Sequence, residues 1–81
     1  MADLRVTYDK TADAAYVYLT DPQVRTRSSY MHPCDPEDVG GMINLDFDER
    51  GRLIGIEVLG AASKLPEYLL ASSDRLDVGD S

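Results

Sequence analysis

Cysteine, tryptophan, phenylalanine and long apolar runs are scarce or absent in this sequence of 81 residues. No apolar run approaches the roughly 20 residues that a membrane-spanning helix needs, so no membrane partner is expected. The single cysteine, Cys34, cannot form an intramolecular disulfide, which agrees with a reducing compartment. The N-terminal residues also lack the charged and apolar segments of a secretory signal peptide. We therefore predict a cytoplasmic protein.

Basic residues are also few: 8 Lys and Arg stand against 15 Asp and Glu, which gives a formal net charge of -7 at pH 7. The basic residues are spread along the chain and form no stripe. A net negative charge repels phosphate backbones, so we expect no nucleic-acid partner. The same charge favours contact with a basic protein, which is one partner that we consider.

The length predicts one small domain over residues 1–71. Residues 72–81 are small and acidic with no apolar periodicity, so they are predicted to form a disordered acidic tail. A domain of this size buries only about 60% of the surface that its unfolded chain exposes. Its core is therefore modest, and a deep catalytic cleft would remove contacts that the fold needs. We expect a protein that is not an enzyme and that holds no cofactor.

β-prone residues gather in five segments separated by turn-forming residues, and the chain closes on a short helical pattern. The predicted strands are 5–8, 14–19, 24–31, 42–48 and 52–59, and the predicted helical turns lie within 61–70. The strand over 24–31 is expected at a sheet edge, and the proline- and glycine-containing segment 32–41 is expected to be a loop. The predicted fold class is α+β: an antiparallel β-meander of four to five strands with a short C-terminal helix.

The segment 42–48 shows the clearest alternation of apolar and polar residues. The side predicted to face the core carries Ile43, Leu45 and Phe47. The side predicted to be solvated carries Asn44, Asp46 and Asp48. Residues 46–57 also resemble the spacing of a calcium-binding loop, but Arg50 occupies a ligand position and the flanking segments are strands. A hairpin turn closed by Gly51 is the favoured interpretation.

The loop expected over 32–41 gathers residue types that bind metals, and we treat His32, Cys34 and Asp35 as its candidate ligand residues. A structural zinc site needs four ligands, and one His with one Cys falls short of that number, so no metal site is assigned. An imidazolium such as that of His32 favours the reactive thiolate of a nearby cysteine. The stiff Pro33 between them and the lack of a second catalytic motif speak against catalysis, so no catalytic residue is assigned.

Asp9 and Asp13 flank the first predicted turn. Two carboxylates can act as a general acid and a general base, but each can instead accept backbone N–H bonds within the turn, and this capping role is favoured. Tyr16 and Tyr18 share one side of the second predicted strand, where aromatic residues most often form core or cross-strand pairs. We consider both tyrosines as interface residues.

Two blocks of residues carry a resemblance to a known family. The first contains Tyr8-Asp9, Asp13-Ala14 and Tyr16-Val17, and the second runs from Leu45 to Asp48 and from Gly51 to Leu59. Together they resemble the DUF2283 family of small bacterial or phage domains, from Leu4 to about Leu65. The resemblance implies a β-meander with a small helical end, and it assigns no function and no catalytic residue. The chain departs from the usual pattern by a longer segment over 31–41.

A sheet of four or five strands with one short helix leaves part of a sheet face uncovered. Two copies packed face to face would cover it, and an isologous dimer is the commonest arrangement of this kind. We therefore predict a homodimer and, as the function, a non-enzymatic protein-interaction module that self-associates. The alternative is a small-ligand or metal-binding protein, with or without enzymatic activity, that uses the loop from His32 to Asp38.

Overall fold

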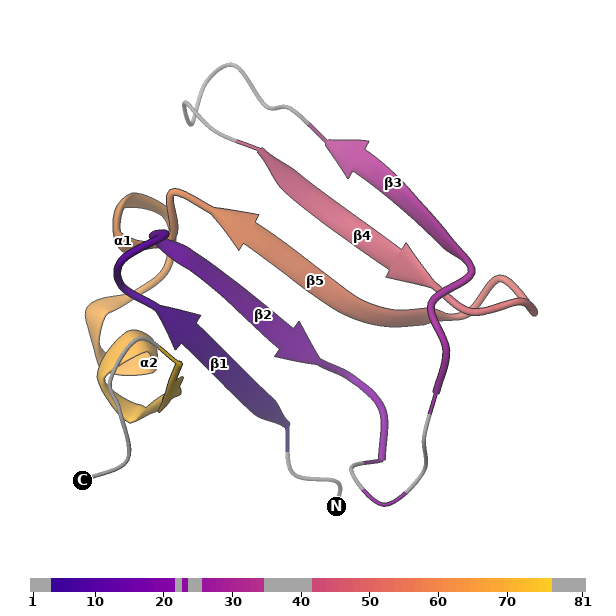
Figure 1. Ribbon diagram of the computed structural model, residues 1–81, viewed down its shortest axis with the longest axis horizontal. Coiled ribbons are helices and arrows are strands. Elements are labelled where there is room, and N and C mark those ends of the chain that lie inside the picture. Colours follow the sequence, from indigo (N-terminus) through magenta and orange to yellow (C-terminus); the bar gives the residue numbers. More distant parts are fainter. Residues whose placement is uncertain (1–3, 22, 24–25, 35–41, 77–81) are drawn as a thin grey trace.

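The computed structural model describes residues 4–21, 23, 26–34 and 42–76. In this part of the chain six strands form one sheet, and two short helices lie at one corner of it (Figure 1). The elements are β1 (Arg5–Asp9), β2 (Ala14–Tyr18), β3 (Tyr30–Cys34), β4 (Ile43–Phe47), β5 (Leu53–Leu59), α1 (Ala61–Lys64), α2 (Glu67–Ser72) and β6 (Asp74–Arg75). The predicted α+β class is confirmed.

The strands lie in the order β3-β4-β5-β2-β1-β6. Strands β1 to β5 pair in antiparallel fashion, whereas β6 pairs with β1 in parallel. The predicted antiparallel meander of four to five strands is therefore wrong in three respects: the described sheet has six strands, one pair is parallel, and β2 pairs with β5 and not with the next strand of the chain, β3. The sixth strand forms because the chain returns beside β1 after α2, where the Leu76 N–H donates to the Tyr8 carbonyl over 2.8 Å.

Two tight turns follow the prediction from the sequence. The hairpin of β4 and β5 is confirmed, and Gly51 closes its turn with a φ of 76°, a conformation that favours glycine. In the turn between β1 and β2, the Asp9 carboxylate accepts the backbone N–H groups of Thr11, over 3.0 Å, and Ala12, over 3.2 Å. The predicted capping role of Asp9 is therefore confirmed.

The edge strand lies further along the chain than the sequence indicated. Within the described residues, β3 at Tyr30–Cys34 replaces the predicted strand 24–31 and takes in the first residues of the predicted loop. Pro33 had favoured a loop, but an edge strand tolerates proline because it pairs on only one side. The rest of that loop, residues 35–41, lies outside the described residues.

The predicted C-terminal helix is divided in two. Leu65 ends α1 in an extended conformation, with φ -108° and ψ 147°, because the following Pro66 disfavours helical backbone at the residue before it. α2 then begins directly after Pro66 and ends at Ser72. The tail predicted over 72–81 thus begins within α2, and Asp74–Arg75 form β6. Residues 77–81 lie outside the described residues, and their disorder stays a prediction.

Asp13 joins the first turn to α1. Gly60, the residue before α1, has no side chain to cap the helix. The Asp13 carboxylate takes this role by accepting the Ala62 N–H over 2.9 Å, and it also accepts the Tyr8 hydroxyl over 3.0 Å. Its backbone carbonyl accepts the N–H groups of Gly60 and Ala61 over 2.8 and 3.0 Å. One residue therefore satisfies three N–H groups at the start of α1, which a helix leaves without intrahelical partners.

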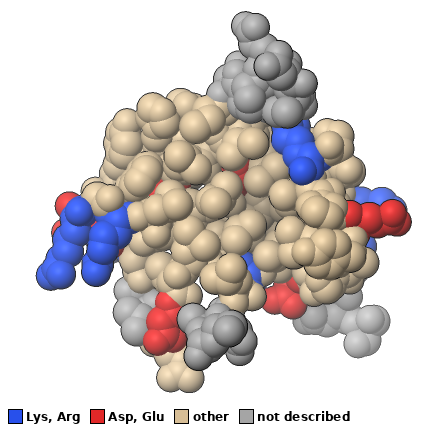
Figure 2. All heavy atoms as spheres, turned by 180° about the vertical axis from the view of Figure 1, so that it is seen from behind, with Lys and Arg blue, Asp and Glu red and all other residues tan. Residues whose placement is uncertain are grey.

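The buried core is small. Its main cluster consists of Tyr8, Ala15, Val58 and Ala61, with Ile43, Ile56, Leu65 and Leu70 packed against it, and Ile54 is also buried. No large side chain in the described part of the chain is fully buried. The helices lie near β1 and the end of β5, and among the described residues no helix lies over β3 and β4 (Figure 1). Seen from behind, charged residues lie mainly around the rim of the molecule, and uncharged residues fill its middle (Figure 2).

Candidate functional site

One face of the sheet carries a continuous set of apolar side chains. Residues directly opposite each other in an antiparallel pair share a face, so the strand register identifies the members of each row. One row across five strands is Val6, Val17, Ile56, Leu45 and His32. The next row is Tyr8, Ala15, Val58, Ile43 and Cys34. The apolar face predicted for 42–48 is therefore one part of a face shared by all five strands.

The helices cover only one end of this face. Tyr8, Ala15 and Val58 belong to the core cluster that contains Ala61 of α1 and contacts Leu65 and Leu70. In the row that includes Val17 and Ile56, the aliphatic side chains are half-buried and His32 is exposed. We call the half-buried aliphatic and aromatic members of this side the open apolar face: Val6, Val17, Leu45, Phe47 and Ile56. Tyr30 extends it at the β3 edge, where it is 58% exposed and its ring lies 6.0 Å from that of Phe47.

The opposite face carries a buried polar network, contrary to expectation. Asn44 and Asp46 were predicted to be solvated, but they are 7% and 5% exposed. The Asp46 carboxylate accepts hydrogen bonds from the Tyr16 hydroxyl, over 2.6 Å, and from the Ser28 hydroxyl. The Asn44 amide donates to the Glu57 carboxylate over 2.7 Å. Burial is possible because each polar group has a partner, as buried polar groups require.

Tyr16 lies over Gly55, and this arrangement makes the network possible. A side chain at Gly55 would overlap the Tyr16 ring and hydroxyl. The absent side chain lets the ring cross from β2 over β5, so that its hydroxyl reaches Asp46 on β4. Burial, followed by the hydrogen bond to Asp46, raises the pKa of Tyr16. The phenol therefore remains a neutral donor near pH 7.

Both tyrosines proposed as interface residues are engaged within the molecule. The rings of Tyr16 and Tyr18 lie 4.6 Å apart, and the Arg5 guanidinium lies over the Tyr18 ring at 5.2 Å. Both side chains are half-buried and lie on the face opposite to the open apolar face. Their place in an interface stays a prediction.

Asp48 holds the turn between β4 and β5. It was predicted to be solvated with Asp46, but it is 8% exposed. Its carboxylate accepts the backbone N–H groups of Arg50 and Arg52, each over 2.9 Å, and the Arg52 side chain over 3.0 Å. The backbone N–H of Arg52 is the largest cause that lowers the pKa of Asp48. The turn therefore contains a carboxylate that is ionised and fully used in folding.

The candidate ligand residues of the sequence are not brought together with further ligands. His32 is exposed on β3, where its Nδ1 lies 3.3 Å from the Tyr30 hydroxyl, and Cys34 is half-buried on the same face. Asp35 lies outside the described residues. Among the residues that the structure does describe, no group of three or more His, Cys, Asp or Glu side chains could hold a metal ion. Ligand binding by these residues stays a prediction.

The open apolar face had a partial signal in the sequence. Alternation identified Ile43, Leu45 and Phe47 as one side of a strand, and this grouping is correct, because they pair with Cys34, His32 and Tyr30 along one side of β3. The sequence could not indicate that their side remains partly exposed, because this depends on where the helices end. A helical stretch of ten residues can shield only a few strand positions.

These observations define a class of protein: a small α+β domain whose sheet is covered by helices at one end and leaves an aliphatic face open. Residues 5–61 match the model of the DUF2283 family, described as a protein of unknown function. The match covers more than half of the chain, so the chain belongs to the DUF2283 family. No curated protein and no solved structure matches the chain. None of the helices in the described part of the chain is long and apolar enough to span a membrane.

Proposed function

We propose that this protein is a small non-enzymatic interaction module that self-associates through its open apolar face. The observation that carries the proposal is a row of aliphatic side chains left half-exposed on a sheet in which no large described side chain is fully buried. Apolar area exposed in this way is stabilising only when a partner removes it from water.

The side chains of the open apolar face support a partner that packs on the sheet. Val6, Val17, Leu45, Phe47 and Ile56 are each half-buried, and Tyr30 beside them is 58% exposed. A stable protein interface covers about 800 Å² of each partner and places apolar side chains at its centre.

A second copy of the chain is the occupant that fits this face best. The open apolar face contains no charged residue, so two copies with a net charge of -7 can approach with their charges at the periphery. Edge-to-edge pairing is disfavoured, because β3 contains Pro33 and the opposite edge strand, β6, spans only two residues. Two sheets packed face to face, about 10 Å apart, would enclose the exposed rows in an isologous contact.

The test is the mass in solution of matched variants, measured by light scattering over a range of concentrations. The wild-type chain is expected to be a dimer. Leu45→Glu places a charge on the open apolar face and is expected to give a monomer. Met31→Glu is the control, because Met31 lies on the opposite side of the neighbouring strand and is already 41% exposed. A wild-type chain that is monomeric throughout, or a Leu45→Glu variant that remains dimeric, would overturn the proposal.

Circular dichroism of Leu45→Glu and Met31→Glu tests whether both variants are folded, which the comparison of their masses requires. If Leu45→Glu loses its β-sheet signal, Leu45→Ser is the milder replacement, since it removes the apolar side chain without adding a charge.

A basic protein is the alternative partner that the sequence suggested for the acidic surface. Binding to such a partner would weaken as salt is added, whereas self-association of two acidic copies would strengthen.

A further inference from the structure

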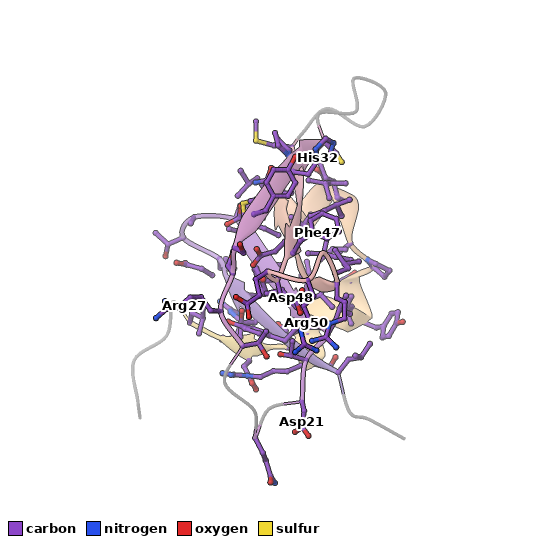
Figure 3. The ribbon with its side chains drawn as sticks, turned by 90° about the vertical axis from the view of Figure 1, so that its right-hand side faces the viewer. Asp21, Arg27, His32, Phe47, Asp48 and Arg50 are labelled. Carbon is purple, nitrogen blue, oxygen red and sulfur yellow. The ribbon has the colours of Figure 1, made fainter. Side chains whose placement is uncertain are left out.

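A groove lies at the end of the β4–β5 hairpin, away from the helices. Its volume is about 500 Å³. One wall is the segment Thr26, Arg27, Ser28 and Ser29, which leads into β3, and the other is the turn with Asp48, Glu49, Arg50 and Arg52. Figure 3 shows Asp48 and Arg50 beside each other at this turn, and Arg27 on the neighbouring segment with its side chain extending away from the turn. The lining of the groove thus contains three arginines in a chain of net charge -7.

One of the two acidic residues that line the groove, Asp48, is already paired within the protein. Asp48 accepts two backbone N–H groups and the Arg52 side chain, with a distance of 3.0 Å between Arg52 Nε and the Asp48 carboxylate. Glu49 is the other acidic residue of the lining and is exposed. The remaining charge of the groove thus comes from Arg27 and Arg50, set against Glu49.

Arg27 and Arg50 differ from the other described cations. Arg5 pairs with Asp74, and the Lys64 ammonium donates to the Leu59 carbonyl. Lys10 and Arg75 also have interactions. Within the described residues, the guanidinium groups of Arg27 and Arg50 have no hydrogen bond or ion pair. These two cations are therefore available to a ligand.

Three hydroxyl groups, which can donate hydrogen bonds, lie on the same wall of the groove as Arg27. Ser28 uses its hydroxyl on Asp46, whereas the hydroxyls of Thr26 and Ser29 have no side-chain hydrogen bond within the described residues. The planar fork of a guanidinium matches the oxygens of a phosphate, and a phosphate group offers three strong acceptor oxygens. We propose that Arg27 and Arg50, with the hydroxyls of Thr26 and Ser29, bind a small phosphate-type oxyanion in this groove.

The net charge of the chain restricts the size of this ligand. A long polyanion would lie over the acidic surface around the groove and be repelled by it. A compact anion lies within about 8 Å of the arginines, and more distant charges are screened at physiological ionic strength. The ligand class is therefore free phosphate or a small phosphate monoester, and nucleic acid is excluded from it.

The test is a titration of the full chain with inorganic phosphate, followed by the backbone amide NMR signals at constant ionic strength. Saturable shifts are expected at residues 26–29 and 49–52. The double variant R27Q/R50Q is expected to bind at least tenfold more weakly. R5Q is the matched control, because it removes an arginine that is paired elsewhere, and it should leave the affinity unchanged.

Malonate, a dicarboxylate, separates the proposed ligand from other anions. Binding of phosphate that is tighter than that of malonate supports the proposal. Equal or tighter binding of malonate, shifts that do not saturate, or an unchanged affinity in R27Q/R50Q would overturn it. The groove residues are not members of the open apolar face, so this result is independent of whether the chain self-associates.

Discussion

Replacement of Asp13 should reveal how strongly one turn residue supports the fold. Its carboxylate accepts the Ala62 N–H at the start of α1 and the hydroxyl of Tyr8, which is 7% exposed. Its backbone has a φ of 52°, which is unfavourable for most side chains but tolerated by Asp and Asn. Asp13→Ala removes both hydrogen bonds and leaves a Cβ in a left-handed conformation.

The individual effects set the expected magnitude. Loss of a helix cap costs about 1 kcal/mol, and loss of the hydrogen bond from the Tyr8 hydroxyl costs about 0.5–1.5 kcal/mol. The left-handed backbone adds about 1 kcal/mol for alanine. Asp13→Ala should therefore lower the free energy of unfolding by about 2.5–3.5 kcal/mol, from a total of about 4–12 kcal/mol for a chain of this length. Asp13→Gly should cost about 1 kcal/mol less than Asp13→Ala, because glycine relieves the backbone strain.

Urea denaturation of the wild type, Asp13→Ala, Asp13→Gly and Asp13→Asn measures these differences in the free energy of unfolding. Asparagine keeps an acceptor oxygen and tolerates the backbone conformation, so the expected order of stability is wild type, Asn, Gly, Ala. Glu49→Ala serves as the control, because Glu49 is an exposed turn residue. The reasoning is refuted if Asp13→Ala lies within about 0.5 kcal/mol of the wild type, the range of ordinary surface substitutions, or if Gly and Ala are equal.

Three further predictions concern the polar network, the hairpin turn and the association. Tyr16→Phe removes a donor from buried Asp46 and should cost about 1–3 kcal/mol in urea denaturation; a neutral effect would show that water replaces the phenol. The lowered pKa of Asp48, caused first by the Arg52 backbone N–H, means that its stabilising effect is present above the unfolded-state value of about 3.9 and is lost as pH falls through the folded-state value. The stability difference between wild type and Asp48→Asn should accordingly shrink on acidification, and a pH-independent difference contradicts this. The dissociation constant of the dimer should be lower at about 200 mM salt than at about 20 mM salt, because screening reduces the repulsion between two acidic copies. A dissociation constant that rises with salt contradicts the proposed face.

The residues that carry the family resemblance mainly serve the fold. Asp13 caps α1, Asp46 anchors the Tyr16 hydroxyl, and Asp48 organises the hairpin turn. Gly55 leaves the space that the Tyr16 ring occupies. These side chains have internal partners, so the shared pattern is a folding pattern in this chain. Most of the open apolar face belongs to this pattern, through Val17, Leu45, Phe47 and Ile56. The two arginines proposed to bind a ligand, Arg27 and Arg50, lie outside its blocks.

Local patterns predicted the strands whose turn chemistry was unambiguous. The β4–β5 hairpin and the capping by Asp9 followed from the alternation of side chains and from residues that favour tight turns. The edge strand β3 was misplaced, because proline normally argues against a strand and only the position at the sheet edge makes it acceptable. The burial of Asn44 and Asp46 was also missed, since their partners Glu57 and Tyr16 are 13 and 30 residues away in sequence.

The sequence by itself determined the class of fold, the main hairpin, the acidic character and the family. These properties depend on side-chain period, turn residues and charge, which are local or additive and can be counted along the chain. Only the tertiary structure decided which sheet face is covered, which carboxylates are buried, and that Arg27 and Arg50 line one groove. These properties depend on contacts between distant segments, because the packing of β3 against β4 and of the helices against one end of the sheet determines what remains exposed.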